Sequence, residues 1–152
     1  MPEIKLTPQE SEKYFHSALC NGLGYVTSGY GLRLDYTKKA YNDAKKSLEE
    51  KIEKGEVPHF VYHPEYEKKE GKKPTICFED VLIEILATGG ALKMTDIEGE
   101  GANPREITIK EVHERVQKTD FDHLNDMINE QDDAVTADVI IQTVFLNEVI
   151  FG

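Results

Sequence analysis

The sequence predicts an α+β fold, a single compact domain of about six helices with one β-hairpin, over residues 1–152. Three observations predict it. Most segments carry helical apolar periodicity and several begin with capping residues. Two short segments near 92–97 and 105–109 alternate apolar and polar residues, which is typical of a hairpin. No strand–helix–strand alternation appears, which argues against a parallel nucleotide-binding sheet.

The first helix is predicted over about Pro8–Asn21. Thr7 can cap its amino end, Pro8 suits the first helical position, and Glu10 completes a capping box. Gly22 follows the apolar face and is expected to end the helix.

The Gly-rich segment after it predicts extended structure. Alternation with Arg33 and Asp35 places three residues on one face of a strand, namely Leu32, Leu34 and Tyr36. We therefore expect a small strand pair near 25–36, turning at Ser28-Gly29.

A second helix is predicted from a cap near Thr37 to a stop at Gly55. Residues 56–75 follow as a long surface loop, because three prolines and a charged run exclude a long helix. A loop of that length is unusual in a compact domain. Either His59–Tyr62 forms a short edge strand or the loop has a function.

The second half continues with helices on either side of the hairpin. The first spans 78–88; the next begins at a capping box of Thr108 and Glu111, and a third spans 120–130. The last helix, about Asp133–Asn147, is apolar on more than one side. Such a helix is usually central to a core or to an oligomer interface, so we expect Val139–Phe151 to form the core or a homodimer contact.

Charge is divided unevenly along the chain. Residues 1–73 have a net charge of +1 and residues 74–152 a net charge of −12, which gives −11 in total. The acidic half disfavours direct binding to nucleic acid or an anionic membrane and favours a protein partner with a basic surface. No signal peptide or membrane-spanning run is evident, and Cys20 and Cys77 lack metal-type spacing, so we expect a cytoplasmic protein with reduced thiols.

Four acidic residues are the candidate partner-binding site. Asp122, Asp126 and Glu130 recur every four residues and would share one helical face, which Asp133 would extend if the helix continued. No neighbouring base compensates them, so a cation, a basic partner surface or the lysines of the first half of the chain could do so, unless they simply face water.

Candidate metal ligands lie in two places. Asp96, Glu98 and Glu100, with Gly101, match the first half of a calcium loop, but its twelfth position falls on Ile107, which cannot coordinate a metal. His113 and His123 could form a second site with Asp126. In both places ordinary surface or buried side chains are the simpler interpretation.

Two further features could bind or react. Tyr25, Tyr30 and Tyr36 could wall a ligand pocket beside the glycines, or they could simply fill the core. Of the two cysteines, Cys77 is the better nucleophile candidate because a helix amino end lowers a thiol pKa, whereas Cys20 is expected at a carboxyl end.

No catalytic or cofactor motif stands out, and no cofactor is expected. The first hypothesis is therefore a non-catalytic protein–protein interaction module that uses its acidic carboxyl-terminal half. One alternative is an inhibitor that imitates DNA, since residues 94–138 hold 13 acids against 4 bases. The other is a metal-dependent enzyme or metal-binding protein with Asp, Glu and His ligands within residues 96–133.

Overall fold

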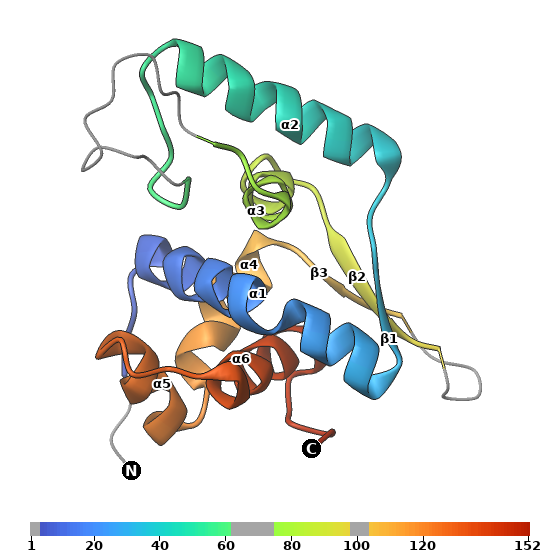
Figure 1. The fold of residues 1–152 in the computed structure, drawn as a ribbon, viewed down its shortest axis with the longest axis vertical. Coiled ribbons are helices and arrows are strands. Elements are labelled where there is room, and N and C mark those ends of the chain that lie inside the picture. The colour runs from blue at the N-terminus through green and yellow to red at the C-terminus, as the bar shows by residue number, and fades with distance from the viewer. Residues whose placement is uncertain (1–3, 62–74, 98–103) are drawn as a thin grey trace.

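A computed structural model describes residues 4–61, 75–97 and 104–152 (Figure 1). Within them, six α-helices and a three-stranded antiparallel sheet confirm the α+β prediction. The elements in chain order are α1 (Pro8–Tyr30), β1 (Leu32–Asp35), α2 (Lys38–Glu53), α3 (Phe78–Ala87), β2 (Leu92–Asp96), β3 (Arg105–Ile107), α4 (Ile109–Arg115), the 3-10 turn η2 (Val116–Lys118), α5 (Phe121–Ile128) and α6 (Ala134–Leu146).

Helix α1 begins as predicted and ends nine residues later than predicted, at Tyr30 instead of Asn21. The Thr7–Glu10 capping box forms, and the helix stops at Gly31, whose φ is 66°. Gly22 lies inside the helix, where its missing side chain lets α6 approach. A Cβ built on Gly22 would lie 2.7 Å from the Cβ of Ala137. Tertiary packing therefore explains this glycine, which local sequence rules assign to a helix end.

The sheet has the order β1–β2–β3. The predicted strand pair near 25–36 is wrong in its first half, because Ser28 and Gly29 are helical, and right in its second half, which is β1. The partner of β1 is β2, with Leu32 opposite Asp96 and Leu34 opposite Met94. The β2–β3 hairpin is confirmed, and its tip lies outside the described residues.

The core lies between α1 and α6, which pack side by side (Figure 1). The rings of Phe15 and Phe145 meet with centroids 5.9 Å apart. Residues 136–146 are buried within the chain apart from Val139, which is partly buried, so α6 is central to the core, as one of the two expectations had it. The packing within one chain does not test a homodimer contact through Val139–Phe151, which stays a prediction.

The chain after α6 folds back onto that helix. Gln142 is buried, and its Oε1 accepts hydrogen bonds from the backbone N–H groups of Ile150 and Phe151, each at 2.9 Å. The Phe151 ring stacks on Tyr30, whose hydroxyl donates to Asp138 at 2.5 Å. One buried amide therefore secures the last residues against the core.

Helix α3 is deeply buried. Seven consecutive residues, Asp80–Leu86, are buried, and two of them are acidic. Asp80 accepts from His16 of α1, whereas Glu84 accepts from Ser47 at 2.8 Å and Lys51 at 2.6 Å, both on α2. The carboxylates of α3 thus join α1 on one side and α2 on the other.

The predicted loop is described at residues 56–61 and 75, and its first part, 56–61, is irregular and still contributes to the core. Phe60 and Val61 are buried. Residues 59–61 form a turn and a bend, so the expected edge strand at His59–Tyr62 is absent from its described part, and Tyr62 lies beyond it. Among the described residues, no helix combines the length and apolarity needed to cross a membrane.

Replacing Gly22 with alanine should destabilise the protein by about 1–3 kcal/mol, because the new methyl group would overlap Ala137. The matched control is Gly24→Ala in the same helix, where a Cβ meets nothing within 4 Å. That change should stabilise the fold by about 0.5–1 kcal/mol through helix propensity alone. Urea unfolding measures both, and shifts of the same sign would contradict the proposed α1–α6 approach.

Replacing Lys51 with methionine should cost about 1–3 kcal/mol, because the Glu84 carboxylate, 1% exposed, would keep only Ser47 as a partner. Lys46→Met is the control, since Lys46 is an exposed lysine of the same helix. Equal unfolding midpoints for the two variants in urea would mean that the Lys51–Glu84 pair contributes no net stability.

Candidate functional site

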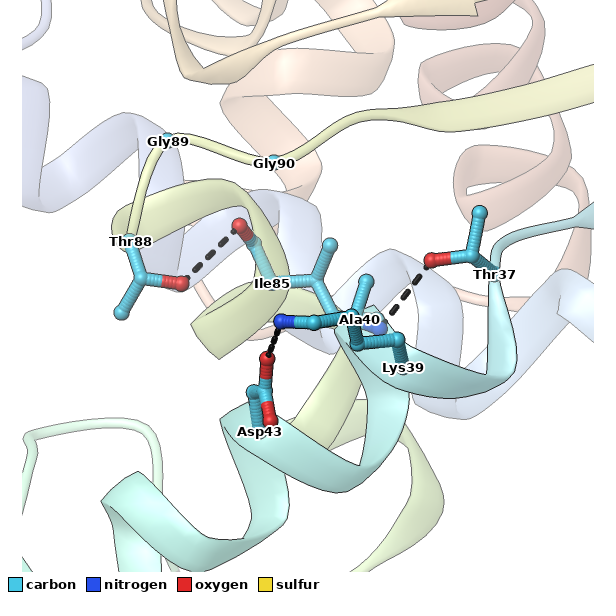
Figure 2. Close-up of a pocket in the computed structure, with 8 residues that line it drawn as sticks. All are labelled: Thr37, Lys39, Ala40, Asp43, Ile85, Thr88, Gly89 and Gly90. Carbon is cyan, nitrogen blue, oxygen red and sulfur yellow. Dashed lines mark hydrogen bonds and ion pairs between the residues drawn. The ribbon is translucent and has the colours of Figure 1, made fainter.

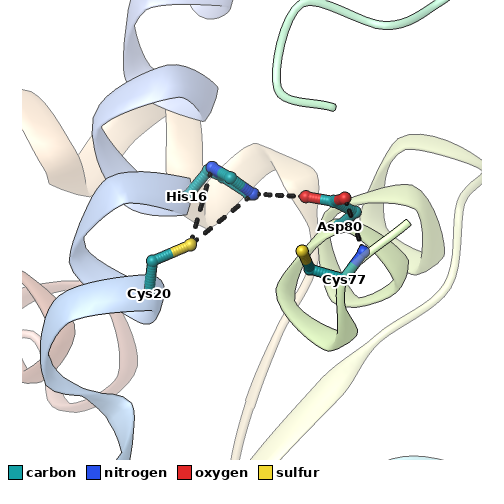
Figure 3. Close-up of polar contacts among 4 residues, drawn as sticks. All are labelled: His16, Cys20, Cys77 and Asp80. Carbon is teal, nitrogen blue, oxygen red and sulfur yellow. Dashed lines mark hydrogen bonds and ion pairs between the residues drawn. The ribbon is translucent and has the colours of Figure 1, made fainter. Parts of the chain in front are cut away.

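The strongest concentration of reactive side chains lies between α1 and α3 (Figure 3). We call His16, Cys20, Cys77 and Asp80 the polar centre. His16 Nε2 donates to Asp80 Oδ1 at 2.6 Å, and the backbone N–H of Cys77 donates to Asp80 Oδ2 at 2.8 Å. Cys20 lies one turn after His16 on α1, and Cys77 caps the amino end of α3. The Asp80 carboxylate, 1% exposed, holds this centre together.

The polar centre contains the residue types of a cysteine–histidine–aspartate triad but lacks its geometry. In such a triad the sulfur and the carboxylate use different imidazole nitrogens. Here Cys20 Sγ lies 3.8 Å from Nε2 and 3.9 Å from Nδ1, so it sits beside the ring and not at the end of one nitrogen. Nε2 already donates to Asp80. We therefore interpret the His16–Asp80 pair as a link between two helices.

The thiols are also poorly suited to attack. Both cysteines are exposed at the surface, but partial desolvation of the Cys20 thiol, with Glu79 and Asp80 nearby, raises its pKa to about 12. Cys20 lies within α1 and not at its carboxyl end, so the expected dipole effect is not the cause. The pKa of Cys77 is raised too, mainly by burial and then by Asp80 and Glu79, which corrects the prediction of a lowered value. Neither cysteine is an activated nucleophile at neutral pH.

A second hollow, of about 290 Å³, lies where α2 begins beside the α3–β2 turn (Figure 2). Its polar side chains are engaged by their own elements. Lys39 donates to Asp43 at 2.7 Å, the Thr37 hydroxyl accepts from the N–H of Ala40, and the Thr88 hydroxyl donates to carbonyls of its own helix. These groups cap helices and pair locally, and none is aimed at a ligand.

The predicted metal residues are not gathered into a site. His113 faces Glu12 of α1, with Nε2 3.4 Å from Oε2, whereas His123 faces Thr136 of α6. Asp96 ends β2, and Glu98 and Glu100 lie outside the described residues. Over 4–61, 75–97 and 104–152, no three His, Cys, Asp or Glu side chains are placed to hold a metal ion.

The three predicted pocket tyrosines separate into two clusters. Tyr25 meets Tyr30 edge to face at 5.6 Å, and Tyr30 stacks on Phe151. Tyr36 instead stacks on Tyr41 at 5.5 Å and lines a different hollow with Phe78. The three rings therefore do not wall one pocket, because Tyr25 and Tyr30 belong to α1 and Tyr36 follows β1.

The acidic candidates lie on α5 and at the turn into α6, but they do not form one helical stripe. Helix α5 ends at Ile128, and Glu130 lies beyond it with φ of 58°. Asp122 and Asp126 remain on α5. Asp133 caps α6, and its pKa is lowered because the N–H of Thr136 donates to it. The left-handed residue Glu130 breaks the spacing that the sequence predicted.

Exposed apolar residues accompany these acids, and sequence reasoning missed them. Phe121 is 36% exposed and Val135 is 57% exposed. They adjoin His123 and Thr136, whose 3.5 Å contact joins the first turns of α5 and α6. We call these residues and the neighbouring acids the α5–α6 surface: Asp120, Phe121, Asp122, Asp126, Glu130, Asp133 and Val135. The sequence signal was available, because residues 119–152 contain eight acids and no Lys or Arg.

Comparisons with known proteins give no indication of function. No family model matches the chain, and no curated protein and no solved structure shows significant similarity to it.

Alkylation of Cys20 by iodoacetamide tests the polar centre. In a Cys77→Ser variant we expect a rate far below that of a free thiol at pH 8, rising about tenfold per pH unit without a plateau below pH 10, because the thiolate forms only near a pKa of about 12. Mass spectrometry follows the adduct. A plateau between pH 6 and 8 would reveal a thiolate stabilised by His16 and would restore the triad interpretation.

Proposed function

We propose that the chain is a non-catalytic protein-binding module whose α5–α6 surface docks on a partner with a basic surface. One observation carries the proposal: residues 119–152 contain eight acidic residues and no Lys or Arg, and the exposed Phe121 and Val135 lie among them. Charge of one sign steers an oppositely charged partner and selects against others. Exposed aromatic and aliphatic side chains supply the apolar contact that charge alone does not give.

The make-up of this surface supports a protein partner over the other hypotheses. A DNA-imitating surface needs dense, regular carboxylates, whereas Glu130 and Asp133 leave the α5 helix and Asp133 is engaged as a helix cap. A metal enzyme needs converging ligands, and His113 and His123 face different helices. Exposed Phe121 and Val135, each close to acidic residues in the chain, instead fit a basic, partly apolar protein surface.

The test is affinity capture from cell extract with the wild type and two variants of equal charge. One variant carries Asp122→Asn, Asp126→Asn and Glu130→Gln; the control carries Glu49→Gln, Glu50→Gln and Glu53→Gln on exposed positions of α2. We expect basic proteins on the wild type and the control at about 50 mM salt, with loss at about 500 mM as charges are screened. The surface variant should lose them at both salt concentrations.

Equal capture by the two variants would reject the α5–α6 surface as the binding site. Addition of duplex DNA distinguishes an ordinary protein partner from the alternative of DNA imitation. A captured protein that DNA displaces would turn the proposal toward DNA imitation, whereas one that stays bound supports an ordinary protein partner. Phe121→Ser gives a further readout, because loss of its apolar contact should weaken capture at low salt without altering the salt dependence.

A further inference from the structure

The outer edge of the sheet is the second place where the chain is open to a partner. Strand β1 borders the sheet, because it pairs with β2 alone (Figure 1). The register places Gly31 opposite Ile97, and the N–H of Ile97 donates to the carbonyl of Gly31 at 2.9 Å. Antiparallel strands alternate between hydrogen-bonded and non-hydrogen-bonded pairs. Arg33 and Asp35 therefore direct their backbone groups toward β2, and Leu34 directs its N–H and C=O outward.

Within the described residues, no backbone or side-chain group forms a hydrogen bond with the outward N–H or C=O of Leu34. An unpaired strand edge is a template for another extended strand. Leu34 is partly exposed and Arg33 is exposed, so this part of the edge is accessible.

An apolar hollow of about 450 Å³ adjoins the same edge. Leu32, Leu34 and Tyr36 line it from the strand, and α1, the start of α3 and Ile97 close its other sides. Two exposed residues, Phe78 at 40% and Ile97 at 59%, leave apolar surface uncovered there. A strand added to β1 would therefore gain apolar contact as well as backbone hydrogen bonds.

The sequence of β1, Leu-Arg-Leu-Asp, is complementary to itself when the strands run antiparallel. A twofold axis at Leu34 would place Leu34 opposite its own copy as a hydrogen-bonded pair. The same register places Arg33 of each chain opposite Asp35 of the other, in the non-hydrogen-bonded positions where side chains approach most closely. Within each chain Arg33 Nε already donates to Asp35 at 2.9 Å, and the twofold would extend this pair into two cross-strand pairs of opposite charge, which are favourable.

We propose that two copies of this chain associate through β1, edge to edge, to form a continuous six-stranded antiparallel sheet. The pairing is separate from the α5–α6 surface, so it stands or falls independently of the proposed function. It also differs from a dimer through the carboxyl-terminal helix, most of which is buried within the chain. Because each copy contributes only a short strand, we expect the association to be weak and to depend on the Arg33–Asp35 pairs between the two copies.

Charge reversal on β1 tests the register. The Arg33→Asp variant would place two aspartates opposite each other in both cross-strand pairs, and the Asp35→Arg variant would place two arginines there. Sedimentation velocity over a range of concentrations should show dimers for the wild type and an association weakened about tenfold or more for each single variant. Mixing the two variants should restore association, because each cross-strand pair of the mixed dimer then joins an aspartate of one chain to an arginine of the other.

A double variant tests the register more directly. A chain that carries both Arg33→Asp and Asp35→Arg again has opposite charges in both cross-strand pairs, so it should dimerise about as well as the wild type. Lys39→Asp is the control, since it breaks a comparable exposed pair with Asp43 on α2 and should leave the dimer unchanged.

Thermal unfolding checks that each variant is folded, which matters for Asp35→Arg because residue 35 also faces Lys93 of β2. A wild type that is monomeric at every concentration would overturn the proposal. So would a dimer that neither reversal weakens, or a folded double variant that fails to associate.

Discussion

The two buried carboxylates of α3 constrain the arrangement of everything around them. Removing a carboxylate from water is costly unless a charged or hydrogen-bonding partner accompanies it. Asp80 and Glu84 lie one turn apart, and their partners come from different helices, His16 of α1 and the pair Ser47 and Lys51 of α2. Because α3 can be buried only when both are present, α1 and α2 must lie on either side of it. Strand β1 connects those two helices and is thereby brought beside β2, the strand that follows α3.

Local rules predicted the helix starts because the chemistry of a cap is complete within four residues. The capping boxes at Thr7 and Thr108 and the cap at Thr37 all form as predicted. Gly22 misled the same rules, because its role is to admit Ala137, a residue more than a hundred positions away. The turn expected at Ser28-Gly29 failed with it, since a helix that continues through Gly22 reaches Gly31 before its backbone turns.

The candidate sites were harder to predict because they depend on contacts across the fold. In α3, an apolar face was evident, but burial on all sides follows from α1 and α2 together and turns two acids into internal links. Helix α5 ends where Glu130 adopts a left-handed φ, so periodicity alone could not keep four acids on one face. The asymmetry of charge, by contrast, needs no three-dimensional information, because the net charge of −12 over residues 74–152 can be counted from the sequence.

The fold holds the acidic α5–α6 surface apart from the lysine-bearing helix α2, and the second proposed contact, strand β1, lies between them. Figure 1 shows α2 and α5 at opposite ends of the long axis, and α2 carries lysines at positions 38, 39, 45 and 46. Four acids on α2 nearly balance its five lysines, and distance and screening separate them from the α5–α6 surface, so the acids of that surface stay available to a basic partner. Strand β1 lies between these ends, with one arginine and one aspartate, so it adds no net charge. Pairing two copies there would not change the field at either end, and the acidic surface would be presented twice by one dimer, which strengthens binding to any partner with two basic sites.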